Sequence, residues 1–317
     1  MRNERNVPTM KRLEASNHQR NVGGLCQIRH GISVIRRDKL AGYSLDMPPV
    51  LAPDALGLGL RTAHYRELLA SWPAVDYFEI ISENFLGEAL PARYHLDQVK
   101  ERYPIVLHGV GLNILGPAPP EPGYLDRIAW LAEHVNAPFF SDHLCWTGAH
   151  GYSHHDLLPA PYVPELVELV AERAALVQKH VGRPFGLENL SSYVELGQST
   201  LSEWEFYAAV VKKAGCHFML DVNNIYVSSQ NHGFEPSQYL DAIDFPRVLQ
   251  LHVAGHTREP NGTLIDTHDQ PVSDAVWQLY RSAQLRAPRP TLLEWDDHIP
   301  PLATVLGELD KARRHRV

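Results

Sequence analysis

The sequence has little cysteine, no excess of positive charge and no long apolar run. Its three cysteines, Cys26, Cys145 and Cys216, are odd in number and widely spaced, and no Cys-x-x-Cys pair is present. This pattern favours a reducing compartment over a disulfide framework, so we expect a cytoplasmic protein. The net charge of −8 argues against nucleic-acid binding, because affinity for a phosphate backbone needs clustered Lys and Arg. No run of roughly 18 apolar residues is present, so we expect no membrane span.

The 317 residues are 44% hydrophobic and 21% charged, as in an ordinary globular protein. Residues 1–45 differ from the rest, because basic residues outnumber acidic ones there and no periodic apolar pattern runs through them. We predict a flexible basic N-terminal extension over residues 1–45 and a single domain over residues 46–317. An organellar transit peptide and a misassigned start, with Met47 nearer the true beginning, are the alternatives for the extension.

Short apolar runs recur from residue 56 onward, each about as long as a buried parallel strand. The eight runs are 56–61, 77–82, 105–110, 139–144, 185–190, 217–222, 248–253 and 291–296. Between them lie segments with helical spacing and helix-terminal residues, such as 162–182 and 199–215. Eight strands alternating with helices over about 250 residues predict a (β/α)8 TIM barrel. A doubly wound open sheet is the alternative, but no Gly-x-Gly-x-x-Gly follows the first run.

Ionisable and amide side chains stand at the ends of these predicted strands, where the active site of a TIM barrel forms. They are His108, Asp142, His143, Glu188, Asn189, Asp221, Asn223, Asn224, His252 and Glu294, with His64, Asp266 and His268 in following segments. Burying so many carboxylates together needs compensating positive charge, which cations can provide. A single His at a strand end is more often a core residue or a substrate contact, but convergence from six or more strands favours a metal site. Nitrogen and oxygen ligands without thiolate suit Fe, Mn or Zn.

The spacing of these residues gives a more specific hypothesis. Asp266 and His268, two apart in an extended loop, are predicted to share one face and bind one ion. Glu188 and Glu294, on different strands, are candidate bridging carboxylates, and the number of ligands indicates two or three ions. The predicted metal ligands are His64, His108, His143, Glu188, Asp221, Asn224, His252, Asp266, His268 and Glu294, and the candidate catalytic residues are Asp142, Asn189 and Asn223.

A long segment, residues 146–162, follows the fourth predicted strand and contains His150, His154 and His155. Its length and its glycines are compatible with a lid or a peptide-binding edge, and equally with a plain surface loop.

The order His, His, Glu, Asp-x-x-(His/Asn), His, Asp-x-His, Glu resembles the trinuclear arrangement of the endonuclease IV and xylose-isomerase-like barrels. That resemblance divides the ligands among three ions: His108, His143 and Glu188; Glu188, Asp221, His252 and Glu294; and Asp266 with His268. Asn224 stands where endonuclease IV has His, so the third ion is expected to be held more weakly or by other groups.

Nine segments between residue 56 and about residue 300 resemble the multinuclear non-haem iron-dependent oxidase family, which includes the iron enzyme of methanobactin biosynthesis. Among them are "FEIISENF", "LHGVGLNI", "SDHLCWTG", "LDVNNIYVS", "DTHDQPV" and "LLEWDDHIP". The resemblance implies a TIM barrel with two or three irons that oxidises a ribosomally made peptide with O2, usually at cysteine, to heterocycles such as oxazolone-thioamide. It also implies a Cys-containing precursor peptide and a small partner protein that presents it.

Two other functions remain open from the sequence. One is a zinc- or manganese-dependent hydrolase or sugar isomerase on the same barrel, although the acidic balance disfavours a DNA-repair version. The other is a non-catalytic metal-containing protein that binds and escorts a peptide.

Overall fold

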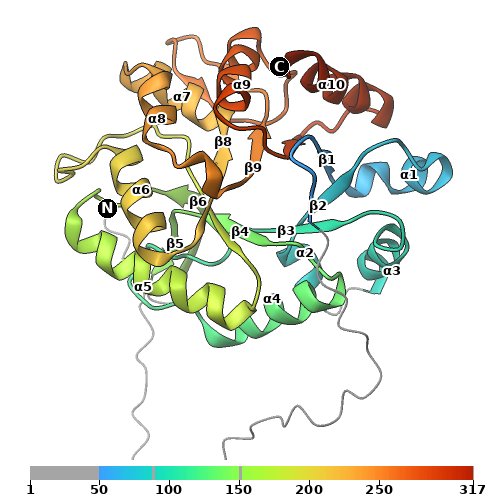
Figure 1. Cartoon of the computed structure of the whole chain (residues 1–317), viewed down its shortest axis with the longest axis horizontal. Coiled ribbons are helices and arrows are strands. Elements are labelled where there is room, and N and C mark those ends of the chain that lie inside the picture. The colour runs from blue at the N-terminus through green and yellow to red at the C-terminus, as the bar shows by residue number, and fades with distance from the viewer. Residues whose placement is uncertain (1–49, 88–89, 150–151, 317) are drawn as a thin grey trace, which may run out of the picture. The chain divides into compact units, whose positions relative to one another are not determined.

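The chain forms a closed barrel of eight parallel strands, which confirms the predicted TIM barrel. The computed structural model describes residues 50–87, 90–149 and 152–316 (Figure 1), so the predicted extension over residues 1–45 lies outside the described residues. The strand order around the barrel is β1-β12-β9-β8-β7-β4-β3-β2. The strands are β1 Leu56–Gly59, β2 Tyr77–Ile81, β3 Ile105–Gly109, β4 Phe140–His143, β7 Phe185–Glu188, β8 His217–Asp221, β9 Val248–Val253 and β12 Thr291–Leu293. Each overlaps one predicted run.

Helices surround the barrel as an outer ring (Figure 1). They are α1 Tyr65–Ser71, α2 Glu83–Leu86, α3 Leu90–Val99, α4 Pro122–His134, α5 Pro164–Val181, α6 Glu203–Ala214, α7 Val222–His232, α8 Pro236–Ala242, α9 Asp274–Arg286 and α10 Leu302–His315. Sequence signals set their ends. The N-terminus of α6 is capped by a capping box that Ser202 and Glu205 form. The C-cap residue of α5 is Gly182, whose φ of 71° places it in the left-handed region.

Parallel pairing brings the carboxyl ends of the strands to one rim of the barrel. The register aligns His108 on β3 with Ser141 on β4, and Asp221 on β8 with His252 on β9. Since every strand runs in the same direction, polar residues at their ends project into one region although they are far apart in sequence. The rest of each strand is apolar and buried between the barrel interior and the helices.

The long segment after β4, for which a lid, a peptide-binding edge and a plain surface loop were the predicted alternatives, contains an antiparallel hairpin. Strands β5 Trp146–Ala149 and β6 Tyr152–Leu158 pair with a register shift between Trp146 and Gly148. The side chain of Asn113 anchors the hairpin: its amide nitrogen donates to the Gly148 carbonyl over 3.0 Å, and its oxygen accepts from the Thr147 amide over 2.7 Å. His150 lies outside the described residues, as do the side chains of His154 and His155.

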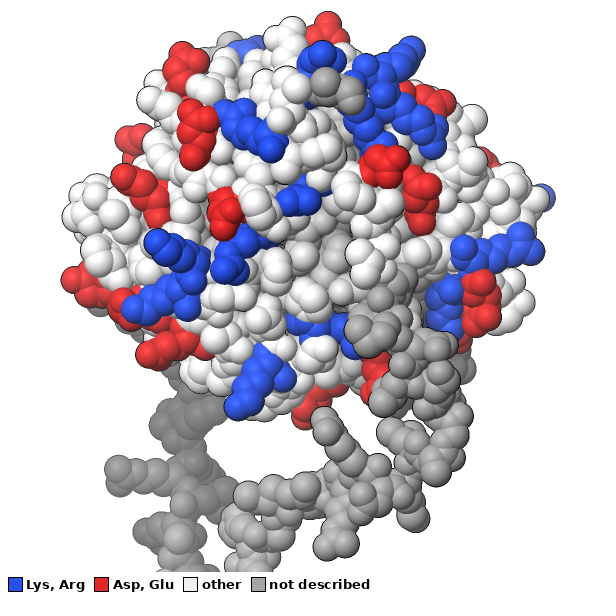
Figure 2. Space-filling model, in the orientation of Figure 1, with Lys and Arg blue, Asp and Glu red and all other residues white. Residues whose placement is uncertain are grey.

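A second short hairpin follows β9, formed by β10 Thr257–Arg258 and β11 Leu264–Ile265. Among the described residues, no helix combines the length and the apolarity that crossing a bilayer requires. On the face drawn in Figure 2, Lys and Arg are interspersed with Asp and Glu.

Candidate metal centre

Two histidines and one carboxylate from three neighbouring strands form a first group of potential metal ligands. Nε2 of His108 lies 3.1 Å from Oε2 of Glu188, and Nε2 of His143 lies 3.2 Å from the same oxygen. The other ring nitrogen of His143 lies 3.1 Å from the Gly109 carbonyl, which can only accept, so Nδ1 carries the proton. In the neutral ring, Nε2 then presents its lone pair to the group, as a metal-binding imidazole requires.

A second group shares Glu188 with the first and adds Asp221, His252 and Glu294, with ligand atoms all within 4.8 Å of one another. Nδ1 of His252 lies 3.0 Å from Oε2 of Glu294 and 3.5 Å from Oε1 of Glu188. Its Nε2 lies 3.1 Å from Oε1 of Glu79, on the side away from the group. Glu79 is thus placed to orient the imidazole of His252, as carboxylates beside metal-binding histidines commonly do.

The third group consists of His268, Glu294 and Asp296, and it differs from the predicted pair of Asp266 and His268. Nδ1 of His268 lies 3.3 Å from Glu294 and 3.2 Å from Asp296, whereas Nε2 lies 2.6 Å from Asp266. The loop is not extended at His268, whose φ is 47°. This turn directs the two ring nitrogens toward different carboxylates, with Asp266 on the Nε2 side of the ring and Glu294 and Asp296 on the Nδ1 side.

Several buried polar atoms at these groups make no hydrogen bond of good geometry among the described residues, although three of them face other ligand-group atoms or Asp266 at ion-pair distances. They are Oε2 of Glu188, Oδ2 of Asp221, Oδ1 of Asn224, Nδ1 of His252 and Nε2 of His268. An unsatisfied buried polar atom costs about 1–3 kcal/mol, and native proteins keep such atoms few. Five of them converging at one rim, each with a free lone pair or an ionisable proton, form a donor set suited to divalent cations.

Burial dominates the acid–base behaviour of His108, His143, Glu188 and Asp221. It raises the pKa of Glu188 well above its ordinary value, although His252 opposes the rise, and it raises the pKa of Asp221 to about 7. It lowers the pKa of His143 to about 4 and the pKa of His108 well below its ordinary range. The neutral imidazole is the form that binds a metal. Ionising the buried carboxyl groups costs free energy, and a bound cation would offset that cost.

The two histidines nearest Glu294, His252 and His268, have pKa values that are raised instead of lowered. Burial lowers the pKa of His252, but Glu79, Glu294 and Glu188 raise it more, and its pKa is well above the ordinary value. Burial likewise opposes ionisation of Glu294, but His252 and His268 bring its pKa well below the ordinary value. Charge at this end is therefore balanced by ion pairs within the protein.

Four of the predicted site residues have partners that give them positioning roles. The side chain of Asn189 makes two hydrogen bonds of 2.9 Å with the backbone of Asp221. Asn223 donates to Asp266 over 2.6 Å and contacts Nδ1 of His256 at 2.8 Å. The amide nitrogen of Asn224 donates to the Asn189 carbonyl over 3.1 Å. Nε2 of His64 lies 2.8 Å from the Pro300 carbonyl, and His64 belongs to none of the three groups.

Asp142, a predicted catalytic residue, faces helix α4 rather than the metal-ligand groups. Neighbouring side chains in a strand point to opposite faces, and Ser141 and His143 take the inner one. Tyr124 of α4 donates to Oδ2 of Asp142 over 3.2 Å and to Glu83 over 2.6 Å. Burial and the nearby Glu83 raise the pKa of Asp142 well above its ordinary value.

A cavity of about 420 Å³ opens beside the ligand groups and gives them access to solvent. It is lined by Ile81, His108, Val110, His143, Asp156, Leu157, Leu158, Glu188, Leu190, Ser191, Tyr193, Asn224, Asp266, Thr267, His268, Glu294 and Asp296. The end of strand β6 therefore forms one edge of this cavity, which we call the metal-side cavity.

Sequence patterns alone assigned no role to Arg61, Gln250 or Asp296, and they placed Glu79 only as an ionisable residue flanking the end of the second predicted strand. Gln250 hydrogen-bonds to Glu79 and lies 2.7 Å from Nε2 of His252. Arg61 donates to the Trp295 carbonyl over 3.0 Å, pairs with Asp296 and lies 3.6 Å from Glu294. Two of these positions carry a local sequence signal. Asp296 belongs to the acidic pair after Trp295 in "LLEWDDHIP", and Glu79 is an acidic residue within the second predicted strand. Arg61 and Gln250 have no comparable local signal.

Residues 55–316 match the protein family described as "RiPP precursor modification enzyme MbnB/TglH/ChrH". A UPF0276 protein of Caulobacter vibrioides is 48% identical over 262 residues, covering 82% of this chain and 93% of that protein. Among solved structures, a D-tagatose 3-epimerase-like protein aligns with a TM-score of 0.56 at 13% identity, covering 82% of this chain and 96% of the other. Endonuclease IV from Thermus thermophilus aligns with a TM-score of 0.50 at 16% identity, covering 82% and 98%. These two structural likenesses show the barrel fold alone.

Proposed function

The chain belongs to the RiPP precursor modification enzyme family, and on that premise we propose that it is a multinuclear non-haem iron oxidase. In this proposal it acts with O2 on cysteine residues of a ribosomally synthesised precursor peptide. The observation that carries it is the convergence of unsatisfied buried atoms of Glu188, Asp221 and His252 within groups of potential ligands. Imidazoles and carboxylates at this density, with no thiolate among them, suit iron, with zinc or manganese as alternative metals.

Two or three irons per chain would be held by the three groups. His108, His143 and Glu188 would hold the first, and Glu188, Asp221, His252 and Glu294 the second. His268 and Glu294 would hold a third, with Asp296 or Asp266 completing it and Asn224 nearby. When bound, the irons would supply redox chemistry toward O2 and Lewis acidity toward a cysteine thiolate.

The chain itself would bind and orient the reacting cysteine. The metal-side cavity is large enough for a cysteine residue and its neighbours, and Leu157, Leu158 and Leu190 provide apolar walls that limit water. Hydrogen bonds to Gly109 and contact with Glu79 hold the rings of His143 and His252, so both would face the irons without rearrangement.

We propose that the substrate is presented by a small partner protein and that the reaction takes place in the cytoplasm. The family description names a precursor as the substrate, which supports the peptide part of this proposal. Cys145 and Cys216 are both free and buried, which is compatible with a reducing compartment.

The test is metal analysis of protein purified without oxygen, followed by reaction with Cys-containing peptides encoded beside its gene. We expect two or three irons per chain, O2 uptake that depends on the peptide, and a change in peptide mass. Omission of O2 and replacement of the peptide's Cys by Ser are the controls. Zinc as the sole metal with no O2 uptake, or turnover of an aldose or a phosphodiester, would overturn the proposal.

A further inference from the structure

A second cavity of about 410 Å³ lies beside the metal-side cavity, and we call it the lateral cavity. The segment after β7 separates the two and contributes to both. Leu190, Ser191 and Tyr193 line the metal-side cavity, whereas Ser192, Val194 and Glu195 line the lateral cavity. The end of β6 also reaches both, since Leu158 lines one and Pro159 the other. A bound peptide in an extended conformation that lies across this segment can therefore place one side chain in each cavity.

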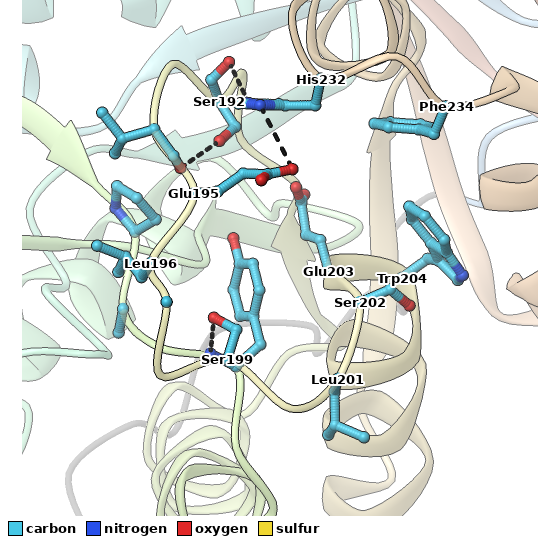
Figure 3. A pocket seen from close by; sticks show the side chains of 15 residues that line it. Ser192, Glu195, Leu196, Ser199, Leu201, Ser202, Glu203, Trp204, His232 and Phe234 are labelled. Atoms are coloured by element: carbon cyan, nitrogen blue, oxygen red, sulfur yellow. Dashed lines mark hydrogen bonds and ion pairs between the residues drawn. The ribbon is translucent and has the colours of Figure 1, made fainter.

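The charge of the lateral cavity is negative. Among its 15 lining residues, Glu195 and Glu203 are acidic and none is Lys or Arg. In Figure 3, the carboxylate of Glu203 points into the cavity toward Glu195 and His232. Glu195 is exposed at the rim, 3.8 Å from Nδ1 of His232. The inward direction and depth of Glu203 make it the principal fixed acid available to a ligand.

Glu203 is not needed to cap the N-terminus of helix α6. That role belongs to Ser202 and Glu205, which form the capping box. Glu203 instead accepts a hydrogen bond of 2.8 Å from the Tyr239 hydroxyl. Burial raises its pKa to about 7, so its environment penalises the charge that a bound cation would stabilise.

Aromatic rings form the apolar wall beside this acid. Tyr162, Trp204 and Phe234 line the lateral cavity, and the ring centroids of Trp204 and Phe234 are 5.0 Å apart. A ligand with an apolar stem and a terminal positive charge matches this combination. The stem can pack on the rings, while the charge meets the carboxylate and the faces of the aromatic rings.

We propose that the lateral cavity binds a basic side chain, Lys or Arg, of the precursor peptide whose cysteine occupies the metal-side cavity. The identity of the occupant as the precursor rests on the proposed function. The charge and shape complementarity to a basic side chain rests on Glu203, Trp204 and Phe234. The lateral cavity would thus select the register in which the peptide lies across the rim.

Binding of two blocked pentapeptides to the intact full-length protein tests this inference. The probes are acetyl-Gly-Ala-Lys-Ala-Gly-amide and the same peptide with norleucine in place of lysine, and isothermal titration calorimetry at pH 8 is the readout. We expect the lysine peptide to bind about tenfold more tightly than the norleucine peptide, the preference that one desolvated charge contact gives. Lowering the pH to 6 should reduce this preference, because Glu203 becomes protonated.

Glu203→Gln should remove the preference, because the amide keeps the size of the side chain and its acceptor for Tyr239 but loses the charge. Glu172→Gln, an exposed substitution on α5 outside the cavity, is the matched control and should keep the preference. Trp204→Leu, which retains the acid, should weaken binding of the lysine peptide several-fold. Circular dichroism checks that each variant is folded, and the pH dependence of the wild-type protein gives a result that needs no variant.

Equal binding of the two peptides by wild-type protein would overturn the inference, as would a lysine preference that survives in Glu203→Gln. The assay involves neither iron nor turnover, so it separates the two proposals. Peptide oxidation without a lysine preference would remove only this inference. A lysine preference without peptide oxidation would remove the proposed function and leave the lateral cavity as a site for basic side chains.

Discussion

Nδ1 of His252 on β9 lies 3.0 Å from Oε2 of Glu294, the residue that follows the neighbouring strand β12. The two residues are 42 positions apart in the chain, and the parallel register between their strands brings them together at the rim. Both belong to the second ligand group, and Glu294 also belongs to the third. The effects of substituting these residues therefore test the ligand assignment directly.

His252→Ala and Glu294→Ala are each expected to lose bound metal while the barrel remains folded, because each removes a ligand at a strand end and leaves the hydrophobic core intact. Loss of Glu294 should affect two ions and loss of His252 one. Metal content per chain, measured by mass spectrometry beside circular dichroism, checks this. Full metal content in both variants would contradict the assignment.

His64→Ala is the matched comparison, because His64 is a buried histidine of the same rim that contacts the Pro300 carbonyl and no ligand group. We expect it to keep its full metal content and to lose about 1 kcal/mol of stability with that hydrogen bond. Chemical denaturation and metal analysis measure the two effects. Metal loss equal to that of His252→Ala would return His64 to the set of ligands.

Glu79→Gln should weaken metal binding without removing a ligand. The carboxylate lies 3.1 Å from Nε2 of His252 and orients the ring, and loss of such a partner typically costs about 10–100-fold in metal affinity. Competition with a chelator measures the affinity. Glu101→Gln, at an exposed position outside the ligand groups, is the control and should match wild type.

The stability of the protein should depend on the ionisation of Glu203. Its folded-state pKa of about 7 exceeds the ordinary 4.5, so the native state binds the proton more tightly than the unfolded state. The stabilisation from this proton is complete below pH 4.5 and is lost as the pH rises through 7. The shift corresponds to at most about 3 kcal/mol, and solvent access from the cavity reduces it. The stability of Glu203→Gln relative to wild type should thus rise between pH 5 and 8, as measured by urea denaturation; a constant difference would contradict it.

Gly255→Ala should disturb the loop that carries His268. A Cβ at Gly255 would lie 1.9 Å from the carbonyl oxygen of Gln270, and the Gly255 carbonyl accepts from the backbone nitrogen of His268. We expect a loss of about 2 kcal/mol of stability from this overpacking, together with weaker binding at the third ligand group. Gly307→Ala, in α10 with no atom near the added methyl, is the control and should be neutral or stabilising. Equal stability of the two variants would contradict the prediction.

The barrel and the residues at its rim could be predicted from the sequence because apolar runs and strand-end polar residues are local signals. Asp142 illustrates what could not be predicted. It is adjacent to His143, and the way side chains alternate along β4 decides which of the two faces the barrel interior. Asp296 and Asp266 both lie within reach of His268, and the left-handed backbone of His268 determines how each contacts the ring. The lateral cavity arises from packing among segments far apart in sequence, which no single motif encodes.

Two carboxylates, Glu188 and Glu294, each serve two of the three ligand groups. An ion arriving at the first group would deprotonate and fix Glu188, and an ion arriving at the third would fix the already ionised Glu294, so the next ion would encounter a partly ordered position. Metal uptake by the stripped protein is therefore expected to be cooperative, with a steep titration curve and few partially loaded molecules.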